Sequence, residues 1–311
     1  MLPDDVRNLV RERKAARAAG DFDRADALRD ELRMLGWEVQ DRPSGSSVRP
    51  VLPDVPVETG YARPEDLASV LDRPATVAAS LQVVAEDHAD DLRRLLRGLA
   101  THPPGVSWEL VIVANAPAFE VESLLADVPQ AVEPSVLATN ARLGWADAVN
   151  LGLRRSFGEA TILMDTSVEP LGEFVAPLAA ALEQPGVGLA GPWGVSSGNG
   201  RQFEEAPEGE VDAIEAYCLA IRREALRGVA GFDHHFRFYR NADLDFSFAV
   251  RDAGWRALAV AGLPLERHTH RAWASVPVTE RERLSKRNFY RFLKRWGDRR
   301  DLLLHPQLRD H

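Results

Sequence analysis

The feature that most restricts the fold of this chain is an alternation of apolar and amphipathic segments between Thr76 and Asp165. The apolar segments TVAASLQVVA, WELVIVAN, EPSVLATN and ATILMD have the length and composition of buried strands. The segments between them, HADDLRRLLRGLATH, FEVESLLADV and GWADAVNLGLRRSFG, have helical character. Strands that alternate with helices form parallel sheets covered on both faces, so we predict an α/β domain with a mostly parallel sheet.

The fourth strand ends on a single carboxylate, Asp165, which two hydroxyl side chains follow. Open α/β sheets bind ligands at the carboxyl ends of their strands, and this carboxylate is therefore expected in the binding crevice. It could hold a metal or a sugar hydroxyl, or it could be a turn residue. A metal-diphosphate site would be more convincing with a second acid at Ser167, so this stretch by itself leaves the question open.

Composition narrows the class of protein. The chain has 311 residues, 45% of them hydrophobic, which is enough for one large domain and a small appendage. A net charge of -9 argues against a general nucleic-acid binder. The one cysteine, Cys218, excludes an intrachain disulfide, and its apolar surroundings predict a buried inert thiol. We find no signal peptide or membrane span and expect a cytoplasmic protein.

The rest of the sequence predicts further parts. Residues 1–40 form a helical hairpin, because apolar residues recur at helical spacing in two runs that Gly20 separates. Residues 41–74 are rich in Pro, Gly and Ser and are predicted to be an extended linker. The main domain covers residues 75–275, and residues 276–311 form a C-terminal helical extension.

The hairpin sequence RERKAARAAGDFDRADALRDELRMLGWEVQDRPSG resembles the C-terminal helical segment of cysteinyl-tRNA synthetases. The resemblance covers about 35 residues and none of a synthetase active site. Acidic and basic residues balance in this segment, so no nucleic-acid partner is expected. We interpret it as a docking or packing module. In the alternative, its Ala/Leu face packs on the main domain or on a second subunit, which would make a homo-oligomer.

Three polar clusters stand out in the main domain. Asp165 is the centre of the first, NADLDFS places Asp243 and Asp245 at the start of a helix, and RHTHR places His268 and His270 after another apolar strand. Such a set of carboxylates and imidazoles suits a divalent cation, a diphosphate and a base for a sugar hydroxyl. For Asp245 we favour a structural role, as an acidic residue in the first helical turn that the helix dipole stabilises.

The order of these motifs resembles family-2 glycosyltransferases of the GT-A fold from about Thr76 to His270. The matching motifs are NARLGWADAVNLG, MDTS, GFDHHFRFYRNADLDFSFAVRDAG and the late histidine. The resemblance implies a GT-A domain that moves a sugar from a nucleoside-diphosphate donor to a hydroxyl acceptor with the help of Mg²⁺ or Mn²⁺. A UDP-sugar is the expected donor by family habit.

The resemblance also implies roles for particular residues. Asp243 would be the general base, on the face opposite the leaving diphosphate, so that the anomeric configuration is inverted. Asp165 would hold the ribose or the metal, and His268 or His270 would complete the metal shell, with His268 preferred for its spacing from the apolar strand. The residues expected to bind the nucleotide-sugar are Glu86, Asn115, Asn140, Arg142, Asp165 and Thr166. Asp87 is the alternative to Glu86, and Arg142 could equally be an ordinary surface residue.

The chain departs from the family pattern at three acids, since Ala114, Ser167 and Ala242 stand where relatives carry carboxylates. These departures put nucleotide identity and metal affinity in doubt and leave the expected base in place. The alternative function is therefore a non-catalytic nucleotide-sugar-binding or partner-docking protein with a decayed transferase domain. A tRNA-linked factor that uses the synthetase-like hairpin is a third hypothesis.

Two peripheral segments carry open alternatives. The C-terminal helix combines aromatic residues such as Tyr290 with basic residues such as Lys286 and Arg287. It could make a peripheral contact with an anionic membrane, although we favour a helix that packs back on the domain with a basic outer face. His234 and His235 in GFDHHF are expected to be surface residues.

Overall fold

The computed structural model describes residues 3–35, 37–42, 45–50, 60–129 and 132–306. The chain divides into two compact units. Unit 1 comprises residues 1–56 and 72–76, and unit 2 comprises residues 57–71 and 77–311. In the described parts of the chain, no helix has both the length and the apolar character that crossing a membrane requires.

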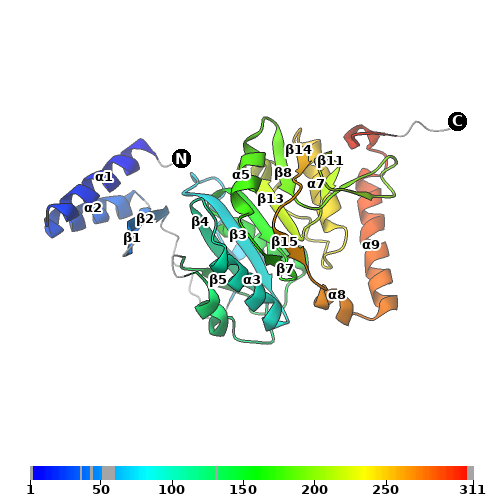
Figure 1. Ribbon diagram of the computed structural model, residues 1–311, viewed down its shortest axis with the longest axis horizontal. Coiled ribbons are helices and arrows are strands. Elements are labelled where there is room, and N and C mark those ends of the chain that lie inside the picture. Colours follow the sequence, from blue (N-terminus) through cyan, green and yellow to red (C-terminus); the bar gives the residue numbers. More distant parts are fainter. Residues whose placement is uncertain (1–2, 36, 43–44, 51–59, 130–131, 307–311) are drawn as a thin grey trace. The chain divides into compact units, whose positions relative to one another are not determined.

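Unit 1 contains the predicted helical hairpin, α1 (Asp4–Ala18) and α2 (Phe22–Met34), drawn in blue in Figure 1. Gly20 turns the chain between the helices with a φ of 75°. The Asp21 carboxylate accepts a hydrogen bond from the Arg24 N–H at 3.0 Å, as expected of a residue that caps the second helix.

The segment predicted to be a linker is structured at both ends, which sequence reasoning missed. Its first residues belong to an antiparallel pair, β1 (Trp37–Arg42) and β2 (Gly45–Pro50). Trp37 and Val39 bury their side chains with those of the hairpin. Ser and Gly are weak strand formers, so the composition hid β2, which pairing with β1 stabilises.

At the other end of the predicted linker, residues 60–71 pack on unit 2. Tyr61 bridges Thr139, the 3-10 helix η1 covers Pro64–Asp66, and the Val70 N–H donates to the Arg154 carbonyl at 2.9 Å. Residues 51–59 lie outside the described residues.

The core of unit 2 is an eight-stranded sheet. In spatial order its strands are β11 (Gly209–Val211), β14 (Arg256–Ala259), β8 (Val187–Gly191), β13 (Cys218–Arg222), β6 (Gly158–Met164), β3 (Val77–Ala85), β4 (Trp108–Ala114) and β5 (Ser135–Ala138). The predicted parallel strands β3, β4, β5 and β6 are neighbours, and β14 is parallel to β8. Only β13 and β11 run against their neighbours, so the prediction of a mostly parallel sheet is confirmed.

Two small sheets flank the large one. The strand β9 (Gly194–Ser196) pairs with β10 (Glu204–Ala206) and β12 (Ala213–Ile214). The strand β7 (Val168–Pro170), which follows Asp165, pairs with β15 (Leu265–Arg267), which precedes the two late histidines. This last pair joins the first and third polar clusters of the sequence.

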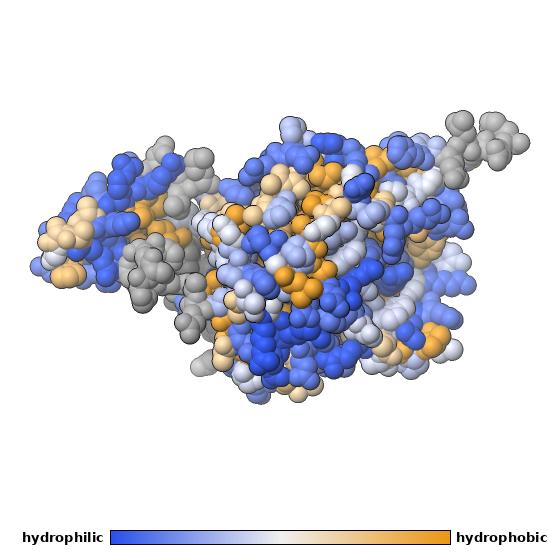
Figure 2. All heavy atoms as spheres, viewed as in Figure 1, coloured by the Kyte–Doolittle hydropathy of each residue, from blue (hydrophilic) through white to orange (hydrophobic). Residues whose placement is uncertain are grey.

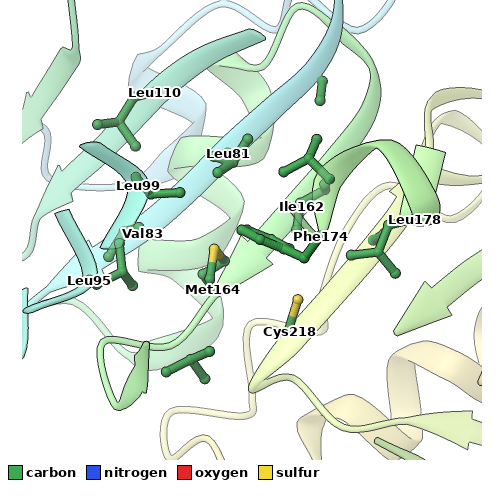
Figure 3. Close-up of a cluster of buried hydrophobic side chains, with 14 of the residues drawn as sticks. Leu81, Val83, Leu95, Leu99, Leu110, Ile162, Met164, Phe174, Leu178 and Cys218 are labelled. Carbon is green, nitrogen blue, oxygen red and sulfur yellow. The ribbon is translucent and has the colours of Figure 1, made fainter. Parts of the chain in front are cut away.

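Helices cover both faces of the large sheet, as predicted. The helices α3 (Ala89–Thr101) and α5 (Val175–Glu183) share one apolar core with β3 and β6. On the other face lie α4 (Trp145–Arg155), α6 (Arg223–Val229) and α7 (Ala242–Asp252). The segment FEVESLLADV forms the 3-10 helix η2 (Val121–Asp127). The first core contains Cys218 (Figure 3), and burial raises the pKa of its thiol, which confirms the expected inert cysteine.

The C-terminal extension begins with α8 (Arg271–Ser275) and α9 (Val278–Trp296) and ends with the 3-10 helix η3 (Arg300–Leu302). The helix α9 lies beside α7 (Figure 1), and Phe292 and Trp296 pack against Phe248. The favoured expectation, that this helix packs back on the domain, is confirmed. Asp245 of α7 accepts a hydrogen bond from Trp296 Nε1 at 2.8 Å and is therefore a packing residue.

Candidate active site

A cavity of about 290 Å³ opens where β3 and β6 end, with Glu86 and Asp165 in its wall. A smaller cavity of about 20 Å³ shares Asp165, Tyr239 and His270 with the first and is also lined by Asp243. We call the two cavities together the central pocket. The structure therefore brings the predicted strand-end carboxylate and the predicted base to one place, although they are far apart in the sequence.

Asp165 is held as an anion at the end of β6. Its Oδ1 accepts hydrogen bonds from the Ser167 N–H, at 2.8 Å, and from the Ser167 hydroxyl. Its Oδ2 lies 3.3 Å from His270 Nε2. Burial opposes ionisation, but the partners His270 and Ser167 outweigh it, and the pKa of Asp165 lies below its ordinary value. The position of the missing second acid is thus occupied by Ser167, whose hydroxyl donates a hydrogen bond to Asp165.

His270 faces Asp165 from the N-terminus of α8. Its Nδ1 accepts a hydrogen bond from the Trp273 N–H at 3.1 Å, so in the neutral ring the proton lies on Nε2, toward Asp165. The ring stacks on Tyr239, with centroids 4.5 Å apart. Burial lowers the pKa of His270, but the Asp165 carboxylate raises it by more. The pKa of His270 therefore lies above its ordinary value. Below the raised pKa the ring also carries a proton on Nδ1, and it then gives up the Trp273 hydrogen bond and forms an ion pair with Asp165.

His268, the histidine preferred for a metal in the sequence analysis, does not reach Asp165. Its N–H donates to the Ser167 carbonyl at 2.8 Å, as a continuation of the β7–β15 pairing, and its Nε2 lies 2.7 Å from a Glu169 carboxylate oxygen. It does not line the central pocket. The geometry favours His270 over His268, because the two further residues let the chain leave the strand and turn back over the pocket.

Asp243 lies in the first turn of α7 and faces the smaller cavity. Its carboxylate accepts hydrogen bonds from the Ala216 N–H at 3.2 Å and the Leu244 N–H at 3.0 Å. Burial raises its pKa above the ordinary value despite these hydrogen bonds and the charge of Arg240. Two carboxylates of one pocket therefore have pKa values shifted in opposite directions.

Glu86 lines the pocket, whereas Asn115 supports it from behind. The Asn115 side chain is buried, and its amide donates to Glu86 Oε1 at 2.7 Å and accepts from the Leu143 N–H at 2.8 Å. Burial raises the pKa of Glu86 above its ordinary value. The expectation that Asn115 contacts a nucleotide is corrected, since its polar atoms are engaged in positioning Glu86 and the loop at Leu143.

Arg142 and Thr166 both line the larger cavity, and Asn140 does not. The Arg142 guanidinium makes two hydrogen bonds to the Asp87 carboxylate, at 2.8 and 2.9 Å. Asn140 is exposed, and its N–H donates to the Tyr61 carbonyl at 3.1 Å. The motif that contains Asn140 therefore contributes through its loop and through α4, where Gly152 lets the helix approach Gln82 of β3 so closely that a Cβ would not fit.

Among the residues of the central pocket that sequence reasoning did not assign are two tyrosines and an arginine beside His270. Tyr217 and Tyr239 line the smaller cavity and both contact the His270 ring. Arg271 lines the larger cavity and is held by Asp91 of α3 at 2.7 Å. Neither tyrosine belongs to a polar cluster in the sequence. The signal for Arg271 was its place as the last residue of the RHTHR motif.

A second group of ligand-type side chains lies elsewhere. Asp233, His234 and His235 have ligand atoms within 4.8 Å of one another and are the one such group of three found in the described residues. None of them lines the central pocket. Both histidines are exposed, as expected.

The fold and the pocket define a GT-A domain, and comparison with known proteins gives its family. The family model for glycosyl transferase family 2 matches residues 82–247, more than half of the chain. The chain belongs to glycosyl transferase family 2.

Solved structures share the fold at low sequence identity. GalNAc-T7 with UDP, GalNAc and Mn²⁺ superposes with a TM-score of 0.55 at 14% identity, over 73% of this chain and 49% of that chain. The mannosyltransferase PcManGT from Pyrobaculum calidifontis with GDP-Man and Mn²⁺ gives 0.52 at 18%, over 74% and 67%. S. aureus TarS 1-349 with UDP-GlcNAc gives 0.53 at 15%, over 75% and 68%. The chain thus spans half to two thirds of these proteins.

The N-terminal segment matches a different family. The model for the cysteinyl-tRNA ligase anticodon binding domain covers residues 1–49. The cysteine–tRNA ligase of Nitratidesulfovibrio vulgaris is 66% identical over 38 residues, and that of Salinibacter ruber is 51% identical over 45. These matches cover 12% and 14% of this chain but 8% and 9% of the ligases. The resemblance is therefore confined to about a tenth of a ligase.

Proposed function

We propose that the chain is an inverting glycosyltransferase that moves a sugar from a nucleoside-diphosphate donor to a hydroxyl acceptor in the central pocket. The observation that carries the proposal is the meeting of Asp165 and Asp243 in one cavity. We propose that the sugar donor binds beside Asp165 and that the acceptor binds beside Asp243. Membership of glycosyl transferase family 2 supports the reaction class.

In the proposed reaction Asp243 takes the proton of the acceptor hydroxyl. The acceptor oxygen forms a bond to the anomeric carbon, and the bond between that carbon and the diphosphate oxygen breaks, so that the nucleoside diphosphate leaves. Attack from the face opposite the leaving group inverts the configuration. A pKa raised by burial makes Asp243 a stronger base than a solvated carboxylate, and such a base contributes roughly 10²–10⁴-fold in rate.

A divalent cation fits between Asp165 and His270. Neighbouring ligands of an octahedral ion of this size lie roughly 3 Å apart, close to the 3.3 Å between Asp165 Oδ2 and His270 Nε2. When bound, the ion would offset the charge of the leaving diphosphate. The His270 ring would then carry its proton on Nδ1 and give up the hydrogen bond from the Trp273 N–H. Structures of similar fold that contain Mn²⁺ support this choice.

The nucleoside end of the donor is proposed to lie against Glu86 and the Asp87–Arg142 pair. The Glu86 carboxylate faces the pocket, and its oxygens can accept hydrogen bonds from a base or from ribose hydroxyls. A UDP-sugar remains the first donor to test, because two of the structures with the same fold contain UDP or UDP-GlcNAc. The bound GDP-Man in PcManGT makes GDP-sugars the second.

The test is a calorimetric titration of the full chain with UDP, GDP and dTDP, each with and without Mn²⁺. We expect one diphosphate to bind and Mn²⁺ to strengthen it. Donor turnover is then followed by release of the diphosphate from the matching sugar nucleotide. A chain that binds none of the three with or without metal would contradict the proposed function.

The second candidate is a nucleotide-sugar-binding protein without activity. It is favoured by Ser167, whose hydroxyl bonds Asp165, and by Ala242, which is buried in the apolar core where the family pattern has an acid. One measurement distinguishes the transferase from the inactive binding protein. Slow hydrolysis of a bound sugar nucleotide, lost on substitution of Asp243, excludes the inactive protein.

A further inference from the structure

The helix α9 carries a positive charge that the rest of the chain does not share. Its 19 residues include seven arginines and lysines and two glutamates, a net charge of +5. The chain as a whole carries -9, so the other residues carry -14. Charge is therefore segregated onto the outer edge of unit 2, where α9 lies (Figure 1).

Four of the seven cations of α9 lie in one stripe. At 3.6 residues per turn, residues 283, 286, 287, 290 and 294 fall in a sector of about 100°. All five are exposed, and the opposite side of the helix holds the buried Asn288, Phe292 and Trp296. We call Arg283, Lys286, Arg287, Tyr290 and Lys294 the α9 stripe.

Among the described residues, one of the four cations of the stripe is paired with a carboxylate, and the other three are not. Arg283 pairs with Glu280 at 2.6 Å. In the part of the chain that the structure describes, Lys286, Arg287 and Lys294 have no carboxylate partner within ion-pair distance. The ring of Tyr290 is 59% exposed and has the Lys286 ammonium 5.9 Å from its centroid. The ring is thus largely open to solvent and has a cation of the same stripe beside it.

We propose that the α9 stripe docks the protein on an anionic lipid bilayer. Lysine and arginine side chains beside such a surface bind its headgroups, and a tyrosine places its ring at the interface with its hydroxyl in water. The stripe is a single convex helix face, which lies flat on a bilayer and lacks the groove with stacked aromatics that single-stranded nucleic acids use. Figure 2 shows mostly hydrophilic residues, with a few apolar ones, along the edge of unit 2 where α9 lies. The cations and the single aromatic ring of the stripe make the proposed contact electrostatic and peripheral.

Docking through the stripe would hold the central pocket near the bilayer. Ser275 and Val276 line the pocket, and α9 begins two residues later at Val278, which is 58% exposed. The docking proposal does not depend on the proposed transferase activity, since it rests on the charge and exposure of α9 alone.

The test is co-sedimentation of the full chain with vesicles of phosphatidylcholine, and with vesicles in which phosphatidylglycerol replaces a third of it. We expect sedimentation only with the anionic vesicles, and a decrease as NaCl is added. Each cation beside an anionic surface contributes roughly fivefold in affinity. The triple variant K286E/R287E/K294E, which also adds repulsion, should therefore bind more than about a hundredfold more weakly, and Y290A a few-fold more weakly.

A matched control variant has the same net charge as the triple variant, but its charge reversals lie outside the α9 stripe. The variant R11E/K14E/R201E also reverses three exposed cations, and we expect it to bind as the wild type does. The neutral variant K286Q/R287Q/K294Q serves if charge reversal disturbs the thermal melt. No sedimentation of the wild type, or an equal loss in the control, overturns the proposal. So does a stripe-dependent gel shift with bulk tRNA in the absence of vesicle binding, which would assign the stripe to nucleic acid.

Discussion

Asp165 and Asp243 line one small cavity, yet their surroundings differ. Asp165 has a histidine on one oxygen and the hydroxyl and N–H of Ser167 on the other, and its pKa is lowered. Asp243 has two backbone N–H groups and a buried site, and its pKa is raised. The pKa of the same side chain is thus shifted down on one side of the pocket and up on the other, which are the directions that the proposed anion and the proposed base require.

The comparison teaches that burial alone does not decide the state of a carboxylate. Desolvation is the largest effect at both residues and raises the pKa of each. A cationic partner in direct contact reverses the outcome at Asp165, whereas Arg240 near Asp243 only reduces the shift. Roles can therefore be assigned from the partners of each carboxylate.

The largest expected effect is that of Asp243→Asn. Loss of the base should slow sugar transfer by about 10²–10⁴-fold, while binding of the donor diphosphate stays within about twofold, as a base that acts only on the acceptor requires. Since the buried charge disfavours the fold, the amide should leave the thermal melt unchanged or raise it. Single-turnover transfer and calorimetry measure the two effects.

Asp245→Asn is the matched control, two residues along the same helix turn. Asp245 bonds Trp296 and Arg295 and lies outside the central pocket. This substitution removes the ion pair with Arg295 and should leave the transfer rate of the folded protein intact. If both substitutions stopped transfer equally, the first turn of α7 would matter for its structure, and Asp243 would lose its special role.

Much of this comparison could be foreseen from the sequence. Strand-to-helix alternation predicted the parallel strands, and the positions of Asp165 after a strand and Asp243 in a first helix turn predicted that both would face the crevice. The antiparallel β13 was not foreseen, because an apolar run such as CLAIR carries no information on direction. The β1–β2 pair was hidden by Ser and Gly.

The choice between two histidines shows where sequence reasoning ends. His268 and His270 lie two residues apart, and both follow the same strand. The selection depends on tertiary contacts, since Glu169 of β7 holds His268 and the N-terminus of α8 directs His270 to Asp165. Tyr217 and Tyr239 were missed for the same reason, because their place beside His270 arises from loops that meet only in the fold.

The next largest expected effect is a loss of Mn²⁺ binding, which tests the proposed role of Asp165 and its partner His270. His270→Ala should weaken Mn²⁺ binding in the presence of the donor diphosphate by at least about tenfold, because an imidazole ligand is lost. His268→Ala is the matched control and should leave Mn²⁺ affinity unchanged, since this ring pairs with Glu169. Calorimetry with Mn²⁺ decides, and the reverse pattern would restore His268 as the ligand.

The ion pair should also make stability depend on pH in metal-free protein. The raised pKa of His270 stabilises the fold fully below its unfolded value of about 6.5, and this contribution is lost as pH rises through the folded pKa. The lowered pKa of Asp165 stabilises above about 3.8 and is lost as pH falls through its folded pKa.

The pair therefore contributes most between roughly pH 4 and pH 6.5. Urea unfolding in EDTA should show that His270→Ala loses about 1 kcal/mol more at pH 5.5 than at pH 8.5. The same measurement on His268→Ala gives the background from a more exposed pair. A loss that is equal at both pH values would mean that His270 stabilises through stacking on Tyr239 and not through charge.

The smallest expected effect concerns the hydroxyl that replaces the second acid. In Ser167→Ala the Asp165 carboxylate keeps the N–H of residue 167 and His270 but loses one hydrogen bond, so its pKa should rise toward the ordinary value. One such bond is worth about 1 kcal/mol, which predicts a donor affinity about fivefold weaker and an unchanged requirement for Mn²⁺. Calorimetry with the donor diphosphate, at several Mn²⁺ concentrations, measures both quantities. A loss of Mn²⁺ binding as large as that of His270→Ala would mean that the hydroxyl contacts the ion itself, and the donor side would then have three protein ligands where we infer two.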